Sequence, residues 1–458
     1  MKAYNINKLN SSFKIDSAIN FSTMLKKSNY KFIFNSFLRN MVGNDIWIDE
    51  KVLNDESVLD RWNKKDIVLF KFLFKGDKIE NKIIEEILGK ESQEFLISIN
   101  FAKLKDDFLY SNGYSIVPIN DMFILVSTPN EYNNEASKFV DIYIGQDSFS
   151  MMNMISDKKF KNILDLCAGS GIQGFNALKS NNCLLTSIEI NENAYNSIKI
   201  NAALNGMDEN TSAILSDLYD KIKDTKFDCI LSNPPYVPAP TNINVPICGD
   251  GGEDGFKIVK KIISGYEKYL TDDGYAYMVL ECIGNDEEPY IIDVFKQYVK
   301  NGILNIRVIT AIPVEMQIDY SVDLISYLSN SENNFKVRNE FERIFRENKA
   351  IKMYSVVIEY INKDVPLIIN RIDTNNIPIR KQYSFNEDIE FDKIKLEFIK
   401  IMIDKKPILN INKNIFKNIK KNNTVKELFD SLKSEERDEY MLIFTILKEN
   451  KILDFEKE

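Results

Sequence analysis

The sequence predicts an α/β protein built on a mainly parallel sheet, with a helical part before the sheet and a mainly helical extension after it. Between residues 162 and 232, short apolar stretches of strand character alternate with longer stretches of helical spacing. The first of these strands, residues 162–166, runs through a glycine-containing turn directly into a helix. Successive strand and helix units are typical of parallel sheets, whose ligands bind beyond the carboxyl ends of the strands.

The first 128 residues are predicted to form a separate helical domain that resembles a winged helix. Three stretches have apolar residues at helical spacing: residues 64–74, 81–88 and 92–109. Two further stretches alternate like a short hairpin around Asn120-Asp121: residues 114–118 and 122–126. A winged helix that reads DNA needs a basic recognition helix, whereas residues 81–88 carry Glu85 and Glu86 beside Lys82. We therefore expect substrate or partner docking, with duplex binding as the alternative.

The turn after the first strand has the composition of a ligand-binding loop. It reads Cys-Ala-Gly-Ser-Gly-Ile-Gln-Gly over residues 167–174. Gly169 and Gly171 let the backbone approach a ligand closely, and a helix beginning near Ile172 directs its free N–H groups toward that ligand. Because Gly174 completes a Gly-x-Gly-x-x-Gly spacing, a nicotinamide or flavin cofactor stays open at this point.

An acidic residue follows each of the next two predicted strands. Residues 183–188 end in Glu189, which is placed to accept hydrogen bonds from the two hydroxyls of a ribose. Residues 212–216 end in Asp217, which is placed to accept a hydrogen bond from the amino group of an adenine. Each carboxylate has the alternative role of capping the next helix. Their order at the ends of successive strands favours a ligand that carries both a sugar and a base.

The tetrapeptide Asn233-Pro234-Pro235-Tyr236 follows the fourth predicted strand, residues 227–232. The two prolines remove two backbone donors and stiffen the turn, so that the Asn233 side-chain oxygen and the Pro234 carbonyl can face one incoming NH2 group. Tyr236 can stack on a planar substrate. The alternative is an ordinary turn after a strand, where proline and asparagine are common.

The rest of the chain predicts three more strands and a long insert. The strands cover residues 275–280, 304–311 and 353–360. The insert, residues 312–352, is predicted to be a lid over the substrate or a plain surface addition. We place the sheet domain at residues 129–372. Residues 373–458 form a mainly helical module, a candidate for partner binding or dimerisation, and nothing in the sequence sets the oligomeric state.

Composition excludes several kinds of chemistry. The chain of 458 residues has no histidine, which removes the usual general base, the Ser-His-Asp triad and most catalytic zinc sites. No metal site is expected, because Cys167, Cys183, Cys229, Cys248 and Cys282 lack Cys-x-x-Cys spacing and are predicted to be reduced packing residues. The formal charge of −9 disfavours a nucleic-acid-wrapping surface. No run reaches the roughly eighteen apolar residues of a membrane helix, so a cytoplasmic protein without membrane contact is expected.

The glycine turn, Glu189, Asp217 and the tetrapeptide together resemble the class I S-adenosylmethionine-dependent methyltransferases that carry an Asn-Pro-Pro-Tyr motif. This resemblance implies a Rossmann-like, seven-stranded sheet with an antiparallel last strand, S-adenosylmethionine as the cofactor, and methyl transfer to nitrogen. The substrate clamp would be Asn233, Pro234, Pro235 and Tyr236. The implied cofactor positions are Asp147, Asp165, Cys167, Ala168, Gly169, Ser170, Gly171, Gln173, Glu189, Ile190, Ser216, Asp217, Leu218 and Asn233.

Two further segments narrow the resemblance. The glycine-rich residues 249–256 are similar to the stretch that follows the clamp in HemK/PrmC-type glutamine methyltransferases. Residues 171–173 and 201–206 resemble a subgroup of larger bacterial methyltransferases with an N-terminal extension. Residues 143–149 resemble the segment by which that subgroup enters its catalytic domain, and they lack the Arg-Pro stretch of glutamine methyltransferases. Within them, Asp147 is predicted to cap a helix at residues 151–155 or to contact cofactor or substrate.

Three functions are compatible with these residues. The first is an N-methyltransferase that acts on an amide or amine of a protein, a peptide or a peptide-like small molecule. The alternative is an adenine N-methyltransferase that acts on RNA or DNA. A catalytically silent cofactor-binding or scaffold protein is the third, and the presence of Glu189, Asp217 and Asn233 argues against it.

Overall fold

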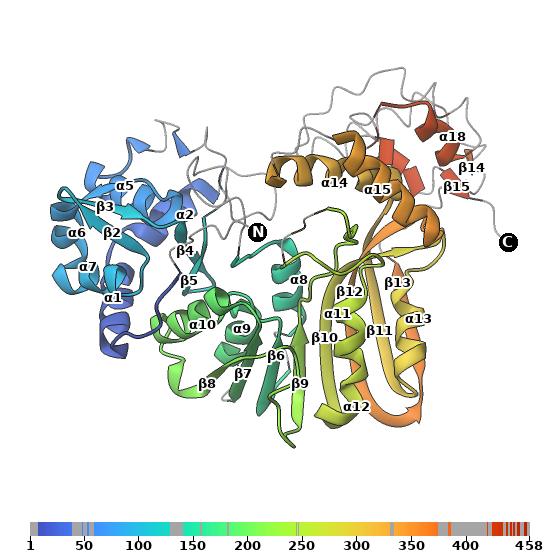
Figure 1. The fold of residues 1–458 in the computed structure, drawn as a ribbon, viewed down its shortest axis with the longest axis horizontal. Helices are drawn as coiled ribbons and strands as arrows, with labels where there is room; N and C mark the ends of the chain where they lie inside the picture. Colours follow the sequence, from blue (N-terminus) through green and yellow to red (C-terminus); the bar gives the residue numbers. More distant parts are fainter. Residues whose placement is uncertain are drawn as a thin grey trace.

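The protein is described from a computed structural model. The described residues are 8–38, 48, 53–54, 59–128, 141–155, 158–180, 183–243, 245, 247–329, 334–373, 383–385, 424–433, 453–455 and several single positions between 419 and 448. Much of the predicted C-terminal module, residues 373–458, lies outside the described residues. The described secondary structure falls into an N-terminal part, a central sheet with its flanking helices, and a C-terminal part that lies over one end of the sheet (Figure 1).

The central sheet has eight strands in the order β13-β11-β12-β10-β9-β6-β7-β8. The strands are β6 (Asn162–Leu166), β7 (Leu184–Glu189), β8 (Thr211–Leu215), β9 (Phe227–Ser232), β10 (Leu270–Gly284), β11 (Asn301–Pro313), β12 (Lys352–Pro366) and β13 (Ile368–Asp373). The predicted antiparallel last strand is confirmed, because β12 pairs antiparallel with both β10 and β11. The sheet has one strand more than the seven that were expected, because β13 adds a parallel edge strand beside β11. It is largely exposed, so it lacks the apolar run by which a buried strand is found.

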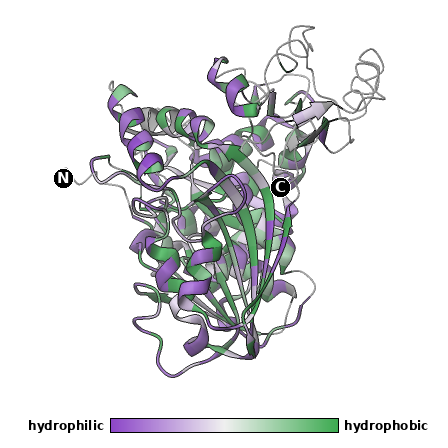
Figure 2. Ribbon diagram, turned by 90° about the vertical axis from the view of Figure 1, so that its right-hand side faces the viewer, coloured by the Kyte–Doolittle hydropathy of each residue, from purple (hydrophilic) through white to green (hydrophobic). Residues whose placement is uncertain are grey.

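Helices cover both faces of the sheet, and two separate apolar cores result. One face carries α8 (Gln146–Met154), α9 (Ile172–Ser180) and α10 (Glu192–Leu204), and the other carries α11 (Lys257–Ser264), α12 (Tyr266–Tyr269) and α13 (Ile291–Tyr298). Neighbouring residues of a strand face opposite cores: Ile163 packs on the first side and Leu164 on the second. Figure 2 shows hydrophobic strands between helices whose outer surfaces are mostly hydrophilic.

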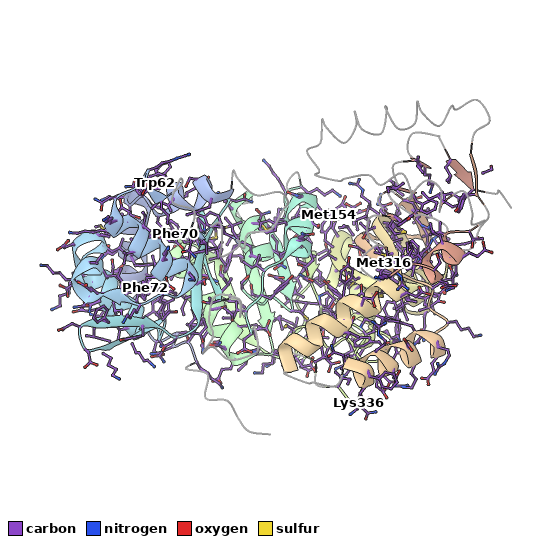
Figure 3. All side chains as sticks on the ribbon, turned by 90° about the horizontal axis from the view of Figure 1, so that it is seen from above. Trp62, Phe70, Phe72, Met154, Met316 and Lys336 are labelled. Atoms are coloured by element: carbon purple, nitrogen blue, oxygen red, sulfur yellow. The ribbon has the colours of Figure 1, made fainter. Side chains whose placement is uncertain are left out.

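Among its described residues, the N-terminal part contains five α-helices and a three-stranded sheet. The helices are α1 (Ile15–Lys27), α2 (Tyr30–Leu38), α5 (Lys64–Phe70, followed by a π-turn at Lys71–Lys75), α6 (Asn81–Leu88) and α7 (Lys90–Ser98). The strands are β1 (Ile79–Glu80), β2 (Ala102–Lys105) and β3 (Phe108–Ser111), in the order β1-β3-β2. The aromatic side chains of Trp62, Phe70 and Phe72 lie in this part (Figure 3).

One helix expected in the N-terminal part is wrong in its second half. The predicted helix at residues 92–109 ends at Ser98, and the remaining residues form the hairpin of β2 and β3. Asp106 and Asp107 make the turn with φ angles of 48° and 60°. Left-handed φ at both central residues matches the twist of a two-residue hairpin turn, and aspartate tolerates it. The helices expected at residues 64–74 and 81–88 are confirmed, the first with its last turn in π geometry.

The predicted second hairpin is confirmed as β4 (Tyr114–Ile119) and β5 (Met122–Ser127), with Asn120 and Asp121 in the turn at φ angles of 46° and 64°. It forms its own two-stranded sheet. The free edge of β5 packs against α10 of the central part, so this hairpin connects the N-terminal part to the sheet region (Figure 1).

Asn201 of α10 and Asn205, the residue that caps the C-terminus of this helix, complete the edge of β5 in place of another strand. The Asn201 amide accepts from the Leu125 N–H at 2.7 Å and donates to the Leu125 carbonyl at 3.1 Å. One helical turn later, Asn205 pairs with Phe123 in the same way, at 3.0 and 2.9 Å. Spacing of four residues on a helix therefore matches spacing of two on a strand. Asn201 also donates to the carbonyl of Ser170, in the glycine turn, at 2.9 Å.

The predicted insert is a pair of helices, α14 (Val314–Ser329) and α15 (Asn334–Glu347), between β11 and β12. The described C-terminal residues include α18 (Val425–Asp430) and an antiparallel pair, β14 (Tyr383–Phe385) and β15 (Leu453–Phe455). Met316 of α14 is buried in one apolar cluster with α18 (Figure 3). Lys426 of α18 pairs with Glu315 at 3.0 Å. Among the described residues, no helix is long and apolar enough to cross a membrane.

The asparagine pair on α10 generates the first prediction. Replacing Asn201 by alanine leaves a buried N–H and carbonyl of Leu125 without partners, so the free energy of unfolding should fall by about 1–3 kcal/mol. Asn205→Ala should cost a similar amount through Phe123. Each variant is the matched control of the other in hydrogen exchange: Asn201→Ala should speed exchange of the Leu125 amide, and Asn205→Ala that of the Phe123 amide. Equal acceleration at both amides in either variant would contradict residue-by-residue pairing.

Candidate active site

The glycine turn has the conformation that the sequence predicts, with one addition. Gly169 and Gly171 have φ angles of 55° and 79°, and a Cβ at Gly171 would lie 2.5 Å from the Phe175 ring. Cys167 is also left-handed, at φ 56°. A left-handed non-glycine residue carries strain and is enriched at functional sites. The sequence gives no signal for this conformation at Cys167, because cysteine shows no preference for it.

Glu189 joins the end of β7 to this turn. Its Oε2 accepts from the Gly169 N–H at 2.8 Å, and its Oε1 accepts from the N–H groups of Ile190 and Asn191 at 2.8 Å. Burial raises the pKa of this carboxyl above its ordinary value, and these three hydrogen bonds oppose the rise. A carboxylate has about four acceptor positions, so roughly one stays available to a ligand. Ile190, also a predicted cofactor residue, is 55% exposed beside Glu189.

Three predicted cofactor residues lie buried around the turn. Asp165 accepts from the Gly174 N–H at 3.2 Å, and burial raises its pKa to about 8. Ser170 and Gln173 are buried as well, and neither the Ser170 Oγ nor the Gln173 Oε1 has a hydrogen-bond partner among the described residues. Buried polar atoms without partners are rare in proteins and call for a ligand or water. Ala168 contributes backbone, its carbonyl accepting from the Gly171 N–H at 2.7 Å.

Asp217 lies two residues after the end of β8. Its carboxylate is paired with Lys261 of α11 at 3.3 Å. The neighbouring predicted residues have structural roles: the Ser216 N–H donates to the Glu189 carbonyl at 2.9 Å, and Leu218 is buried at a φ angle of 42°. An adenine amino group would therefore share the Asp217 carboxylate with Lys261.

The predicted clamp lies at the end of β9, and a residue from elsewhere in the chain joins it. The Asn233 Nδ2 donates to the Asp147 Oδ2 at 3.0 Å, and the Tyr236 hydroxyl donates to the same oxygen at 3.1 Å. Pro234 is buried and Pro235 half-buried. Tyr236 is half-buried, and desolvation, with the Asp147 charge as the next cause, raises the pKa of its hydroxyl well above the ordinary value. The tyrosine therefore stays protonated and acts as a donor.

Asp147 does not have the predicted role of capping a helix at residues 151–155. The helix α8 begins at Gln146, so Asp147 stands in its first turn. Its Oδ1 accepts from the N–H of Ser148 at 2.7 Å, and its Oδ2 faces the clamp. The structure thus brings Asp147 together with Asn233 and Tyr236, not with Glu189.

The glycine-rich residues 249–256 support the clamp from behind. The Val237 N–H donates to the Gly249 carbonyl at 2.9 Å, and the Gly251 N–H donates to the Val237 carbonyl at 3.0 Å. A Cβ at Gly251 would lie 2.7 Å from the carbonyl carbon of Tyr236, and one at Gly255 would lie 2.6 Å from its oxygen. Only glycine permits this approach of two backbones. Arg343 of α15 pairs with Glu253 of this stretch at 3.0 Å, so the insert contacts the support of the clamp.

Sequence reasoning missed Glu281, a site residue on β10. It follows the predicted strand at residues 275–280, and its pKa is raised by burial and by the nearby Asp147 charge. Its proximity also raises the pKa of Tyr236. The available signal was an acidic residue directly after an apolar strand, the pattern that identified Glu189. The prediction that all five cysteines are packing residues is wrong for Cys248, which is exposed in the loop after the clamp.

The glycine support yields a prediction. Gly251→Ala should shift the Tyr236 backbone, because the added methyl cannot fit, and we expect methyl transfer to fall by about tenfold or more. Gly206→Ala is the matched control: it adds the same methyl at the left-handed end of α10, where nothing lies within 4 Å. It should lower stability and leave turnover intact. Transfer of a labelled methyl group checks both, and full activity in the Gly251 variant would contradict the close approach.

Comparison with known proteins agrees with this site. Residues 134–300 match the family model described as the methyltransferase small domain. The chain is 32% identical over 136 residues to the ribosomal protein uL3 glutamine methyltransferase of Francisella tularensis, a match that covers 27% of this chain and 42% of the relative. It is 34% identical over 127 residues to the release factor glutamine methyltransferase of Thermodesulfovibrio yellowstonii, covering 25% of this chain and 45% of the relative.

A third relative, the ribosomal protein uL3 glutamine methyltransferase of Bradyrhizobium diazoefficiens, is 28% identical to this chain over 158 residues. The match covers 32% of this chain and 49% of the relative. The chain therefore spans less than half the length of each of these three relatives. The matched region contains the glycine turn, Glu189 and the clamp. Residues 134–300 accordingly match the methyltransferase small-domain model, and the chain is similar in sequence to proteins named as glutamine methyltransferases.

Proposed function

We propose that this chain is an S-adenosylmethionine-dependent N-methyltransferase that methylates a planar nitrogen of a protein or peptide, with the glutamine side-chain carboxamide as the first candidate acceptor. The observation that carries this proposal is the orientation of Asn233. Its NH2 group is bound to Asp147, so its oxygen is left to accept from an acceptor N–H. The Pro234 carbonyl supplies a second oxygen at the same turn. Two such oxygens match the two N–H bonds of a carboxamide.

The residues around the glycine turn fit S-adenosylmethionine. The Ser170 hydroxyl and the Gln173 amide oxygen are buried polar atoms without described partners, and they can bind the polar groups of this cofactor. Glu189 would bind the ribose and Asp217 the adenine. The carboxyl groups of Asp147 and Glu281 lie near the clamp, and their oxygens suit a sulfonium cation. When bound, the cofactor supplies an electrophilic methyl group with a good leaving group.

The protein's part in the reaction is positioning, because the chain has no histidine to act as a base. Asn233 and Pro234 hold the nitrogen in plane, and Tyr236 covers its flat face. Alignment of the reacting atoms can contribute several kcal/mol to the lowering of the barrier. The proton leaves the nitrogen after positive charge has developed on it, and the surrounding carboxylates or water can receive it.

The names of the relatives support a protein acceptor. Proteins named as methyltransferases of ribosomal protein uL3 and of release factors are similar to this chain over 136 and 127 residues. The parts outside residues 134–300 are where the acceptor would be selected. We propose that residues 1–128 are a winged-helix-like docking domain, that residues 129–372 are the catalytic domain, and that residues 373–458 are a helical module. A cytoplasmic location stays a prediction.

The insert at residues 312–352 supports docking more than a freely moving lid. Its helix α14 shares an apolar cluster with α18 and carries two ion pairs to the C-terminal part, from Glu315 to Lys426 at 3.0 Å and from Asp319 to Arg437 at 3.4 Å. The insert and the C-terminal module would therefore present one surface to a protein acceptor.

An adenine in RNA or DNA is the second candidate, since the clamp also fits an exocyclic amine. The N-terminal part offers little support for it. The face of α7 that carries Phe95 is packed against α1, with ring centroids of Phe95 and Phe21 5.4 Å apart. The exposed charged residues of α6 and α7 are Lys82, Glu86, Lys90, Glu91 and Glu94, which do not form the basic surface that phosphate binding needs.

The function is tested by incubating the protein with labelled S-adenosylmethionine and separate fractions of ribosomal proteins, translation factors, peptides and RNA. Label in a protein fraction, located by mass spectrometry on a glutamine, is expected. Replacing that glutamine by glutamate should remove labelling, because the acceptor nitrogen is lost. Label confined to RNA or DNA would favour the adenine alternative.

Two substitutions separate the clamp from the cofactor site. Asn233→Ala should lower kcat by about 10²-fold or more and leave cofactor binding within about twofold, because the variant loses orientation of the acceptor alone. Glu189→Ala should weaken cofactor binding by about ten- to a hundredfold, since a charged hydrogen bond contributes about 1.5–3 kcal/mol. Transfer of a labelled methyl group measures kcat, and calorimetric titration with the demethylated cofactor measures the affinity for the cofactor. Unchanged turnover in the Asn233 variant, or unchanged affinity in the Glu189 variant, would refute the assigned role.

A further inference from the structure

We infer that Asp147 is a positioning residue of the clamp, which decides the direction in which the Asn233 amide faces. This inference rests on the proposed function and goes beyond it, because the sequence predicts for Asp147 a helix cap or a contact with cofactor or substrate, and no link to Asn233. The residue lies 86 positions before Asn233 and 89 before Tyr236, yet its Oδ2 accepts from both side chains.

The first step concerns the two ways in which an asparagine amide can be turned. An ionised carboxylate has acceptors and no proton to donate. The group of Asn233 that faces Asp147 at 3.0 Å must therefore be its NH2, and the oxygen must face the other way. If the Asn233 amide were rotated by 180°, its NH2 would face the N–H of the acceptor. Two donors cannot form a hydrogen bond with each other. Asp147 thus selects the one orientation that can hold an acceptor nitrogen.

The second step concerns Tyr236. Its hydroxyl donates to the same Oδ2 at 3.1 Å, which ties the ring that covers the acceptor to the residue that orients the amide. One oxygen therefore coordinates both halves of the clamp. Loss of the carboxylate frees both side chains at once.

The third step concerns what holds Asp147 itself. Its Oδ1 accepts from the Ser148 N–H at 2.7 Å, so rotation of the carboxylate is opposed. Its place in the first turn of α8 puts the negative charge at the positive end of the helix. The segment that leads into α8 is consequently part of the acceptor site, although nothing in its sequence indicates the link to Asn233.

The test uses the full-length protein and compares Asp147→Ala with Asp147→Asn. The alanine variant should lose about 10²-fold in kcat at saturating cofactor, with the affinity for cofactor product within twofold of wild type. The asparagine variant keeps an oxygen that can accept from both partners, so it should recover most of this loss. A tenfold weaker cofactor affinity with normal kcat would overturn the inference, as would an asparagine variant no better than alanine.

Combination with Asn233→Ala makes the test specific to the amide. If Asp147 acts mainly through Asn233, adding Asp147→Ala to the Asn233→Ala variant should lower turnover by much less than 10²-fold, because only the contact with Tyr236 is then left to lose. A further loss of 10²-fold would overturn the inference. Thermal unfolding provides a readout without turnover: the Tm shifts of the two single variants should not add in the double variant. Wild-type protein that labels no acceptor refutes the proposed function, whereas additive Tm shifts refute the Asp147–Asn233 link.

Discussion

The register of the parallel strands is the constraint on which the site depends. Leu166 of β6 is aligned with Ile188 of β7 on one side and with Ser232 of β9 on the other. The next residue along each strand is therefore Cys167, Glu189 or Asn233, and the three emerge side by side at one edge of the sheet. A slip of one residue would turn every side chain of a strand to the opposite face. The two apolar cores, which take alternate residues of each strand, oppose such a slip.

The site residues at this edge of the sheet could be predicted from the sequence, because each lies in a local sequence pattern. Glycines at 169 and 171, an acid after an apolar strand and prolines after Asn233 identify their roles without knowledge of the fold. The same local reasoning failed where a second apolar pattern ran on without a glycine or proline, as in the hairpin at Asp106-Asp107. It also failed at β13, whose exposure leaves no apolar run.

Contacts between distant segments could not be predicted, because nothing near Asp147 in the sequence refers to Asn233, and nothing near Glu253 refers to Arg343. The motif at residues 201–206 shows the limit clearly. These asparagines were recognised as a family signature. Asn201 binds the backbone of Leu125 in β5, 76 residues away, and the carbonyl of Ser170, 31 residues away. The candidate site was thus predictable as a set of residues and not as a network.

That network places the additions to the sheet on two flanks of the proposed reaction. On one flank, the N-terminal hairpin is held by Asn201, which also binds the carbonyl of Ser170 in the proposed cofactor turn. On the other, α15 reaches through Arg343 to the glycine-rich stretch that supports Tyr236. A displacement of either addition is therefore transmitted to a different partner of the reaction, the cofactor in the first case and the acceptor in the second. Close backbone packing makes the second path short, since Gly251 and Gly255 approach the Tyr236 backbone so closely that no space is left in which a movement could be absorbed.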